Sequence, residues 1–562
     1  MNVARHVQIR ILIAIASVSL LSACTGDSSG VPENASEASG IETALATISR
    51  DNIQSSLNYL ASDEREGRFP GTRGYDESAQ YVADQFAAVG LEPGGTDGWF
   101  QQVPIITRLI DIENSGITLH TSSGDLDLEW KKDFIIYADP LRPENRIRAE
   151  VVFVGFGIHA PDVGYSDYDG IDVSGKIVAT FRRAPATFPA TERAHYSSDR
   201  TKAAELVRRG AIGQIILSNR LDERISPWKN VTQNVGTQPD MTWIDEGGNV
   251  ADFHPELQGS ARFSRRAAEK LFEGSPLNFE DALDAAEDVR PSSAALGVEV
   301  TMYRKTTHGR VTSPNVIGVL RGSDPVLSKE YVVYSSHLDH LGIGTPVDGD
   351  SIYNGMYDNA LGVATTIEVA RALAALPVPP RRSILFVAAT GEEFGLFGTD
   401  YFGQYPTVPS SALVANVNID MPMTIFPFTT VTGYGAEHSS LEGLVALEVQ
   451  KEGFELRPDP YPDEVYFIRA DQYSFVRQGI PSVYLAEGVE AADPAVDGLA
   501  LVDAFVADHY HQPSDDLSQP IVWEAELKFA RACVRVGYRI AMEEQRPSWN
   551  EGDFFGEMYG KE

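Results

Sequence analysis

Cysteine is almost absent from this chain, whose 562 residues include only Cys24 and Cys533. No disulfide framework can therefore stabilise it, and no intrachain disulfide at all can form if Cys24 is modified. Cys533 lies in a stretch typical of a buried helix, where a thiol packs as a small apolar side chain. Stability must come from the size of the hydrophobic cores.

Basic residues are also scarce, with 46 Lys and Arg against 80 Asp and Glu and a formal net charge of −34. Such an imbalance argues against nucleic acid as a partner, because phosphate binding requires a basic face. Apolar residues make up 43% of the chain and aromatic residues 9%, which are globular values. The length exceeds what one core usually holds, so we expect two or more structural units.

Long apolar runs are missing, and the longest near the start, residues 11–21, is too short for a bilayer that requires about 20 apolar residues. Arg5 and Arg10 precede this run, and Leu-Ser-Ala-Cys follows at 21–24. The segment resembles a bacterial lipoprotein signal peptide, which implies removal of residues 1–23 and lipidation of Cys24. An ordinary signal peptide with an incidental cysteine is the alternative.

The lipoprotein resemblance predicts an exported protein that is anchored to a lipid bilayer in the bacterial cell envelope. Thr25 after the cysteine favours the outer membrane, with the protein facing the periplasm or the cell surface. Residues 24–46 are small and polar in their first half, and we predict a flexible tether there.

The rest of the chain changes its hydrophobic pattern twice. Helical spacing of apolar residues at 48–61 and 75–89 gives way to short alternating runs over 115–180, which predict a β-rich unit. After residue 312, strand-like and helical runs alternate, which predicts a mixed, mostly parallel sheet with helices on both faces. The expected division is a main domain of 47–130 and 301–548, an insert of 131–300 and a C-terminal tail of 549–562.

Two adjacent carboxylates, Glu392 and Glu393, follow the apolar run 384–389, so their charges lie where a buried strand meets a loop. Three further side chains stand in comparable places. His337 and Asp420 each follow an apolar run, and Asp358 precedes a helix-like stretch. Because ligands gather beyond the carboxyl ends of strands in open α/β sheets, we expect these side chains to meet at one site.

The predicted metal ligands are His337, Asp358, Glu393, Asp420 and His511. Imidazole and carboxylate donors suit zinc, and the lack of thiolates argues against a closed structural zinc site. Asp358 has two oxygens and can bridge two ions about 3.5–4 Å apart. Glu393 and His511 would complete one ion, and His337 and Asp420 the other. The neighbouring His340 and His509 are predicted to point away.

Three further residues receive catalytic roles. Two cations can bring the pKa of a water held between them to about 7. Glu392 would take the proton of that water during attack and pass it to the leaving amine. Asp339 can accept the second ring N–H of His337 and fix its tautomer, and Tyr510 can donate its phenol O–H to the developing oxyanion.

These motifs resemble those of the M28 family of dinuclear zinc peptidases. The matching segments are His337-Leu338-Asp339, Gly355-Met356-Tyr357-Asp358-Asn359, Glu392-Glu393-Phe394-Gly395, Asn418-Ile419-Asp420 and His511-Gln512-Pro513-Ser514-Asp515. The Glu-Gly-Arg-Phe-Pro-Gly segment at 66–71 is also similar to the family, and the insert resembles a protease-associated domain.

The resemblance implies a zinc-exopeptidase fold of the phosphorylase/hydrolase-like type, two zinc ions per chain and peptide substrates. The implied activity is that of a metal-dependent exopeptidase, most often an aminopeptidase. A carboxypeptidase or dipeptidase on the same site, a glutaminyl cyclase and a non-catalytic binding protein are alternatives. The chain departs from many relatives at Ala470-Asp471-Gln472 and at Thr399, so its substrate contacts can differ.

Overall fold

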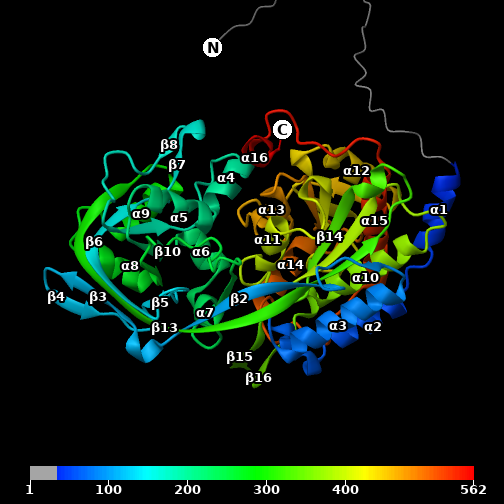
Figure 1. Cartoon of the computed structure of the whole chain (residues 1–562). Coiled ribbons are helices and arrows are strands. Elements are labelled where there is room, and N and C mark those ends of the chain that lie inside the picture. The colour runs from blue at the N-terminus through cyan, green and yellow to red at the C-terminus, as the bar shows by residue number, and fades with distance from the viewer. Residues whose placement is uncertain (1–34, 562) are drawn as a thin grey trace, which may run out of the picture.

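The computed structural model describes residues 35–561, which form two lobes joined by long strands (Figure 1). The predicted signal peptide and the predicted lipidation site Cys24 lie outside these residues. Across 35–561, no helix combines the length and the apolar character that a membrane crossing requires.

The larger lobe is built on a central sheet whose middle strands are parallel. Strand β14 (Tyr331–His337) pairs in parallel with β17 (Ser383–Ala389) on one side and with β18 (Leu413–Asn418) on the other. Strand β18 pairs in parallel with β21 (Ser482–Glu487). Antiparallel strands complete both edges: β13 (Ser293–Leu320) beside β17, and β19 (Thr430–Tyr434) beside β21, followed by β20 (Glu455–Arg457).

Helices cover both faces of this sheet, and successive strand residues supply the two cores. Val332 packs with the helices of one face, whereas its neighbour Val333 packs with those of the other, as the alternation of a strand requires. One face carries α2 (Arg50–Leu60), α3 (Arg73–Ala88), α10 (Gly362–Ala374), α12 (Leu441–Lys451) and α15 (Trp523–Met542). The other carries α11 (Phe397–Gln404) and α13 (Gln472–Val476).

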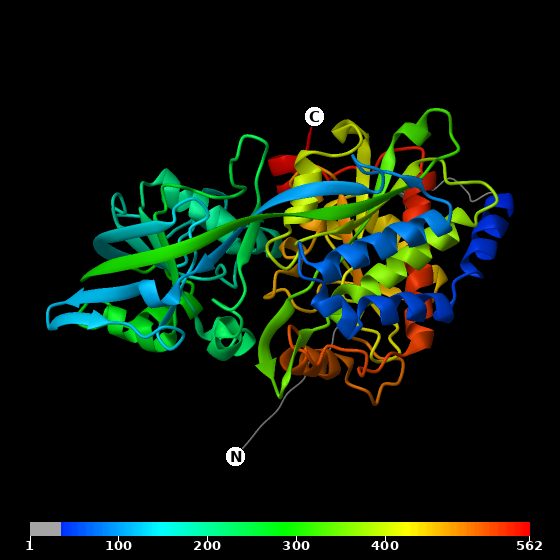
Figure 2. The same ribbon diagram turned by 60° about the horizontal axis from the view of Figure 1, so that its bottom comes forward.

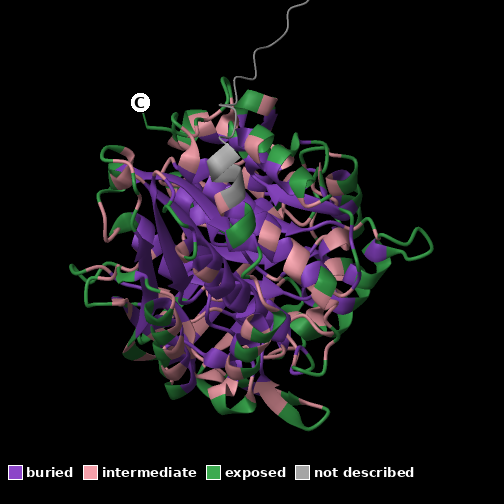
Figure 3. Cartoon of the chain, turned by 90° about the vertical axis from the view of Figure 1, so that its right-hand side faces the viewer, coloured by how far each residue is buried: buried purple, intermediate pink, exposed green. Residues whose placement is uncertain are grey.

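The middle strands are buried along their whole length, which fits parallel strands covered on both faces (Figure 3). The predicted α/β class, with a mixed, mostly parallel sheet and helices on both faces, is thereby confirmed.

The smaller lobe has its own core and is rich in strands, as expected of the insert. Its elements are β3 (Gly116–Thr121), β4 (Gly124–Asp127), β5 (Phe134–Ile136), β6 (Glu144–Val154), β9 (Ile177–Phe181), β10 (Gly213–Leu217), β12 (Gly259–Phe263), α5 (Asp199–Arg208), α8 (Arg265–Phe272) and α9 (Phe279–Glu287). Strand β13 and its antiparallel partner β2 (Phe100–Ile110) run from one lobe into the other (Figure 2).

The packing places the start of the insert earlier than residue 131. The core of the smaller lobe includes Ile117, Leu119 and Leu128, because the β3–β4 hairpin pairs with β13. This core extends from Ile110 to Met302. The core of the smaller lobe therefore begins about 20 residues before the predicted boundary at 130.

Both predicted ends of the main domain also need correction. Residues 35–46 do not form a tether, since helix α1 (Ala35–Leu45) buries Ile41 and Leu45 against the main core. Of the predicted C-terminal tail, the described residues 549–561 pack on the domain, because α16 (Phe554–Tyr559) places the fully buried Phe555 beside Tyr473. In both segments, a few apolar side chains at helical spacing are buried, and their burial orders a stretch whose other residues are mostly polar.

Candidate metal centre

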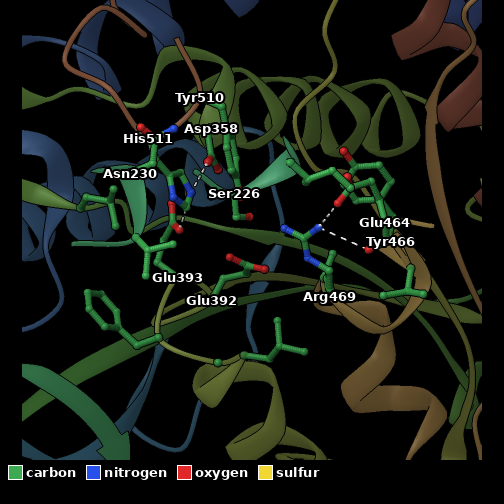
Figure 4. A pocket seen from close by; sticks show the side chains of 18 of the residues that line it. Ser226, Asn230, Asp358, Glu392, Glu393, Glu464, Tyr466, Arg469, Tyr510 and His511 are labelled. Atoms are coloured by element: carbon green, nitrogen blue, oxygen red, sulfur yellow. Dashed lines mark hydrogen bonds and ion pairs between the residues drawn. The ribbon is translucent and has the colours of Figure 1, made fainter. Parts of the chain in front are cut away.

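Three strands of the sheet deliver the predicted ligands to one place. His337 is the last residue of β14, Glu393 follows the end of β17, and Asp420 follows β18. Because these strands are parallel, their carboxyl ends meet at the same edge. Figure 4 shows Asp358, Glu393 and His511 converging in a cavity there.

His337, Asp358 and Asp420 form the first group of donors. The Nε2 atom of His337 lies 3.2 Å from Oδ1 of Asp358 and 3.1 Å from Oδ1 of Asp420. All three side chains are buried. The distances leave the donor atoms close enough to share one cation.

The second group shares Asp358. Its other oxygen, Oδ2, lies 3.2 Å from Nε2 of His511, and the same nitrogen is 2.9 Å from Oε2 of Glu393. The two oxygens of Asp358 thus face different imidazoles, which is the arrangement expected of a bridging carboxylate.

His340 joins this second group, and the prediction that it points away is wrong. Its ring is fully buried, with Nδ1 2.5 Å from Oε1 of Glu393 and 3.8 Å from Oδ2 of Asp358. Gly355 makes room for the ring, since a Cβ at that position would lie 2.5 Å from Cγ of His340. The sequence did indicate this role for His340, because His340 is a third imidazole beside those of His337 and His511 and directly follows the His-x-Asp motif. His509 does remain outside, where its Nδ1 contacts Oγ of Ser514.

The donor set fits two divalent cations. Three buried carboxylates that face one another repel unless positive charge lies between them. Nε2 of His511 is buried between two carboxylates and forms no hydrogen bond of normal geometry with either, as fits a nitrogen that faces a cation. Imidazole and carboxylate donors without thiolate are typical of zinc in enzymes.

Asp339 holds the site in a different way from the one predicted. Nδ1 of His337 lies 3.1 Å from the backbone carbonyl oxygen of Asp339 and 3.9 Å from its carboxylate. The carboxylate instead accepts hydrogen bonds from the backbone N–H groups of Glu392 at 3.2 Å and Glu393 at 3.4 Å. Burial raises the pKa of Asp339 to about 7. Asp339 therefore fixes His337 through its main chain and the Glu-Glu turn through its side chain.

The two adjacent glutamates have different surroundings. Glu393 contacts both His340 and His511, whereas Glu392 forms no ion pair with any described residue and projects into the cavity (Figure 4). Removal from water, together with the charges of Asp420 and Glu393, raises the pKa of Glu392 well above its usual range. Glu392 is thus the carboxylate that is free to exchange a proton.

Tyr510 and Arg469 also line the cavity that Glu392 faces (Figure 4). The ring of Tyr510 stacks on His511 with centroids 3.8 Å apart. The guanidinium of Arg469 pairs with Glu464 at 3.2 Å and directs its charge into the cavity. The sequence did not predict a role for Arg469. The only indication was its position directly before the unusual 470–472 segment.

Arg68 braces the loops that present the ligands. Its side chain is fully buried and donates hydrogen bonds to the carbonyl oxygens of Leu338 at 2.8 Å, Asn354 at 2.6 Å and Gly355 at 2.9 Å. These carbonyls lie beside His337 and Asp358 in the chain. The 66–71 segment quoted for the family resemblance therefore positions the ligands without touching them.

Asp515 fixes the bridging carboxylate from the other side. Its carboxylate accepts hydrogen bonds from the backbone N–H groups of Tyr357 at 3.0 Å and Asp358 at 3.1 Å. The last residue of the predicted His-x-Pro-x-Asp motif thus connects the loop of His511 to that of Asp358.

Among the residues that depart from the family pattern, Ala470 lines the cavity, whereas Thr399 and Gln472 do not. Thr399 donates a hydrogen bond to Asp471 at 2.6 Å, and Gln472 donates one to the carbonyl oxygen of Phe467 at 2.7 Å. All are buried, and neither Thr399 nor Gln472 contacts a predicted ligand.

The cavity has a volume of about 950 Å³ and lies between the two lobes. The smaller lobe contributes Arg182, Ser226 and Asn230 to the lining of the cavity, together with Glu392 and Tyr510 of the larger lobe. The insert is therefore one wall of the candidate active site.

Comparisons with known proteins agree with this geometry. Residues 315–536 match the model of peptidase family M28. The mouse protein Aminopeptidase NAALADL1 is 29% identical over 28% of this chain and 23% of its own length. The Glutamate carboxypeptidase 2 homolog of Caenorhabditis elegans is 22% identical over 68% of this chain and 53% of its own length. The matches thus span about a quarter to a half of these relatives.

A solved structure shows the same fold across both lobes. The aminopeptidase from Aneurinibacillus sp. strain AM-1 superposes with a TM-score of 0.51 at 18% identity, covering 89% of this chain and 95% of that one. The family match includes every predicted ligand and Glu392. The part of the chain that carries the metal centre, residues 315–536, therefore matches peptidase family M28.

Proposed function

We propose that this protein is a zinc-dependent aminopeptidase that removes N-terminal residues from peptides. The observation that carries the proposal is the split between Glu392 and Glu393. Glu393 contacts two imidazoles at the ligand cluster, whereas Glu392 faces the cavity and pairs with no Lys, Arg or His among residues 35–561. A ligand beside a free base is what metal-assisted hydrolysis requires.

His337 and Asp420 would hold one zinc ion, and Glu393 and His511 the other, with Asp358 shared between them and His340 beside the second. When bound, two zinc ions polarise the scissile carbonyl and make water easier to deprotonate. Glu392 accepts the proton that the attacking water loses as its oxygen bonds to the carbonyl carbon. It then donates that proton to the nitrogen as the C–N bond breaks. Tyr510 can donate its O–H to the carbonyl oxygen as negative charge develops there.

The charge of the site favours a free amino terminus. The zinc ions would offset the charges of the ligands Asp358, Glu393 and Asp420. Glu392 is then the carboxylate of the site that is left to attract an ammonium group beside the position where the bond is cut.

Arg469 supports a second candidate, a dipeptidase or carboxypeptidase on the same site. Its guanidinium faces the cavity near Glu392 and could bind the terminal carboxylate of a residue that follows the scissile bond. The complete ligand set with its base argues against a glutaminyl cyclase or a non-catalytic binding protein.

One comparison separates the two candidates. A tripeptide with free ends, its N-acetylated form and its C-amidated form are incubated with the zinc-loaded protein. An aminopeptidase cleaves the free and the amidated peptide and spares the acetylated one. Cleavage of the acetylated peptide, with loss on amidation, would instead establish a carboxypeptidase.

We further propose that the protein carries a lipid anchor and that the insert is a protease-associated domain. The Leu-Ser-Ala-Cys segment at 21–24 supports lipidation of Cys24 in the cell envelope, with the outer membrane favoured. Mass spectrometry of the N-terminal peptide from membranes should show cleavage before Cys24 and a lipid on its thiol. Release of the protein into the soluble fraction by Cys24→Ala would support the anchor. Equal membrane association of both forms would contradict it.

A further inference from the structure

A carboxylate that the catalytic proposal does not use also lines the cavity. Glu487, the last residue of β21, is 7% exposed. Its Oε2 accepts a hydrogen bond from the backbone N–H of Met423 at 3.1 Å, and no described Lys, Arg or His forms an ion pair with it. A buried carboxylate without a cation is costly, so such a residue in a ligand cavity is a candidate for binding a positively charged group.

Several residues near Glu487 give this arm of the cavity apolar and aromatic walls. Tyr434, Tyr461 and Tyr466 lie close enough to interact electrostatically with Glu487, Met423 donates its backbone N–H to it, and Val489 follows two residues later; all of them line the cavity. The ring of Tyr466 lies 5.8 Å from that of Tyr434 and 5.9 Å from that of Tyr461. Aliphatic stems pack on such walls, and aromatic faces attract cations.

The arm adjoins the predicted ligand Asp420. Met421 and Met423 follow this residue directly in the chain, and Tyr484 of β21 donates a hydrogen bond to the carbonyl oxygen of Asp420 at 3.0 Å. In an aminopeptidase, the residue held at the metal ions is the N-terminal one. Its side chain would therefore enter this arm.

Arg469, the cavity arginine that lies against Tyr466, does not pair with Glu487. Arg469 stacks its guanidinium 5.3 Å from the ring centre of Tyr466 and pairs with Glu464 at 3.2 Å. Burial raises the pKa of Glu487 to about 7, and an incoming ammonium would favour the charged form. The carboxylate is thus available to a cation that the substrate brings.

We propose that Glu487 selects substrates whose N-terminal residue is lysine or arginine, with the aliphatic stem on the apolar walls and the terminal cation on the carboxylate. This proposal rests on the aminopeptidase function and adds the substrate class. Without Glu487, the same arm would suit leucine or methionine.

The test compares lysine with norleucine, which has a similar unbranched stem without the ammonium group. For the zinc-loaded protein, kcat/KM for the lysine amide should exceed that for the norleucine amide about 10-fold or more, as a charge-assisted hydrogen bond allows. Glu487→Gln should remove this preference. Glu526→Gln serves as the matched control, because Glu526 is a fully buried carboxyl that does not line the cavity, and its preference should equal that of the unmodified protein.

Binding supplies a readout that does not depend on turnover. Calorimetry with free lysine and free norleucine on the zinc-loaded protein should show tighter binding of lysine. Equal affinities would overturn the proposal for Glu487, because they would show that the carboxylate does not recognise the side-chain ammonium group of lysine. Absence of hydrolysis with a retained preference for lysine would instead refute the aminopeptidase function while leaving the lysine site in place.

Discussion

The Nδ1 atom of His340 lies 2.5 Å from Oε1 of Glu393. His511 contacts the other oxygen of the same carboxylate, so Glu393 is held between two imidazoles. A ligating carboxylate with both oxygens in contact cannot rotate freely, which fixes the position of a second ion.

We expect His340→Gln to weaken binding of one of the two zinc ions by about 10–100-fold, the usual effect of losing a residue that orients a metal ligand. Competition with a chromogenic chelator measures this affinity. His509→Gln is the control, because His509 is the nearby imidazole that contacts Ser514 outside the cluster. Two equally tight ions in His340→Gln would show that this imidazole is dispensable for the metal centre.

Substitution of the two adjacent glutamates should have different consequences. Glu392→Gln should retain two zinc ions and lower kcat by about 10²–10⁴-fold, since only proton transfer is lost. Glu393→Gln should bind fewer than two ions, because a ligand is lost. Metal analysis and steady-state kinetics on both variants decide the matter. Loss of metal from Glu392→Gln would place that residue among the ligands.

Arg68→Lys should destabilise the protein by about 3 kcal/mol or more. Lysine cannot reach the several carbonyl groups that the guanidinium satisfies, and each unsatisfied buried carbonyl costs about 1–3 kcal/mol. Urea unfolding measures the change. Arg73→Lys, at an exposed arginine paired with Glu77, should stay within about 0.5 kcal/mol of the unmodified protein. Similar stability of the two variants would argue against Arg68 as a brace.

Glu526 predicts a pH dependence of stability. Burial raises its pKa from 4.5 to about 7, so the folded state holds its proton more tightly than the unfolded state. The stabilising contribution of this group is complete below pH 4.5 and is lost as the pH rises through 7. The stability advantage over Glu526→Gln should therefore shrink between pH 5 and about 8, as urea unfolding at each pH would show. Glu524→Gln, at an exposed position of the same helix, is measured alongside as the control for loss of a surface carboxylate. A constant difference for Glu526→Gln would contradict the raised pKa.

The alternation of strand-like and helical runs after residue 312 was sufficient to predict the sheet, because buried parallel strands require continuous apolar runs and their crossovers require helices. The same logic placed His337, Glu393 and Asp420 at one edge. It failed at residues 35–46 and 549–561, where Ile41 is buried only by contact with the main core and Phe555 only by contact with a smaller cluster that includes Tyr473. Short helices of this kind owe their stability to packing, which local sequence does not contain.

The sequence by itself determined the fold class and the set of donor types, since these follow from hydrophobic pattern and from the chemistry of imidazole and carboxylate at strand ends. Only the tertiary structure decided which neighbours of the motifs take part. Adjacent loop residues point in directions set by distant contacts, so the space at Gly355 turns His340 inward, while Asp339 orients His337 through its backbone. The closing of the cavity by the insert and the position of Glu487 in its lining depend likewise on segments far apart in the chain, which meet only through folding.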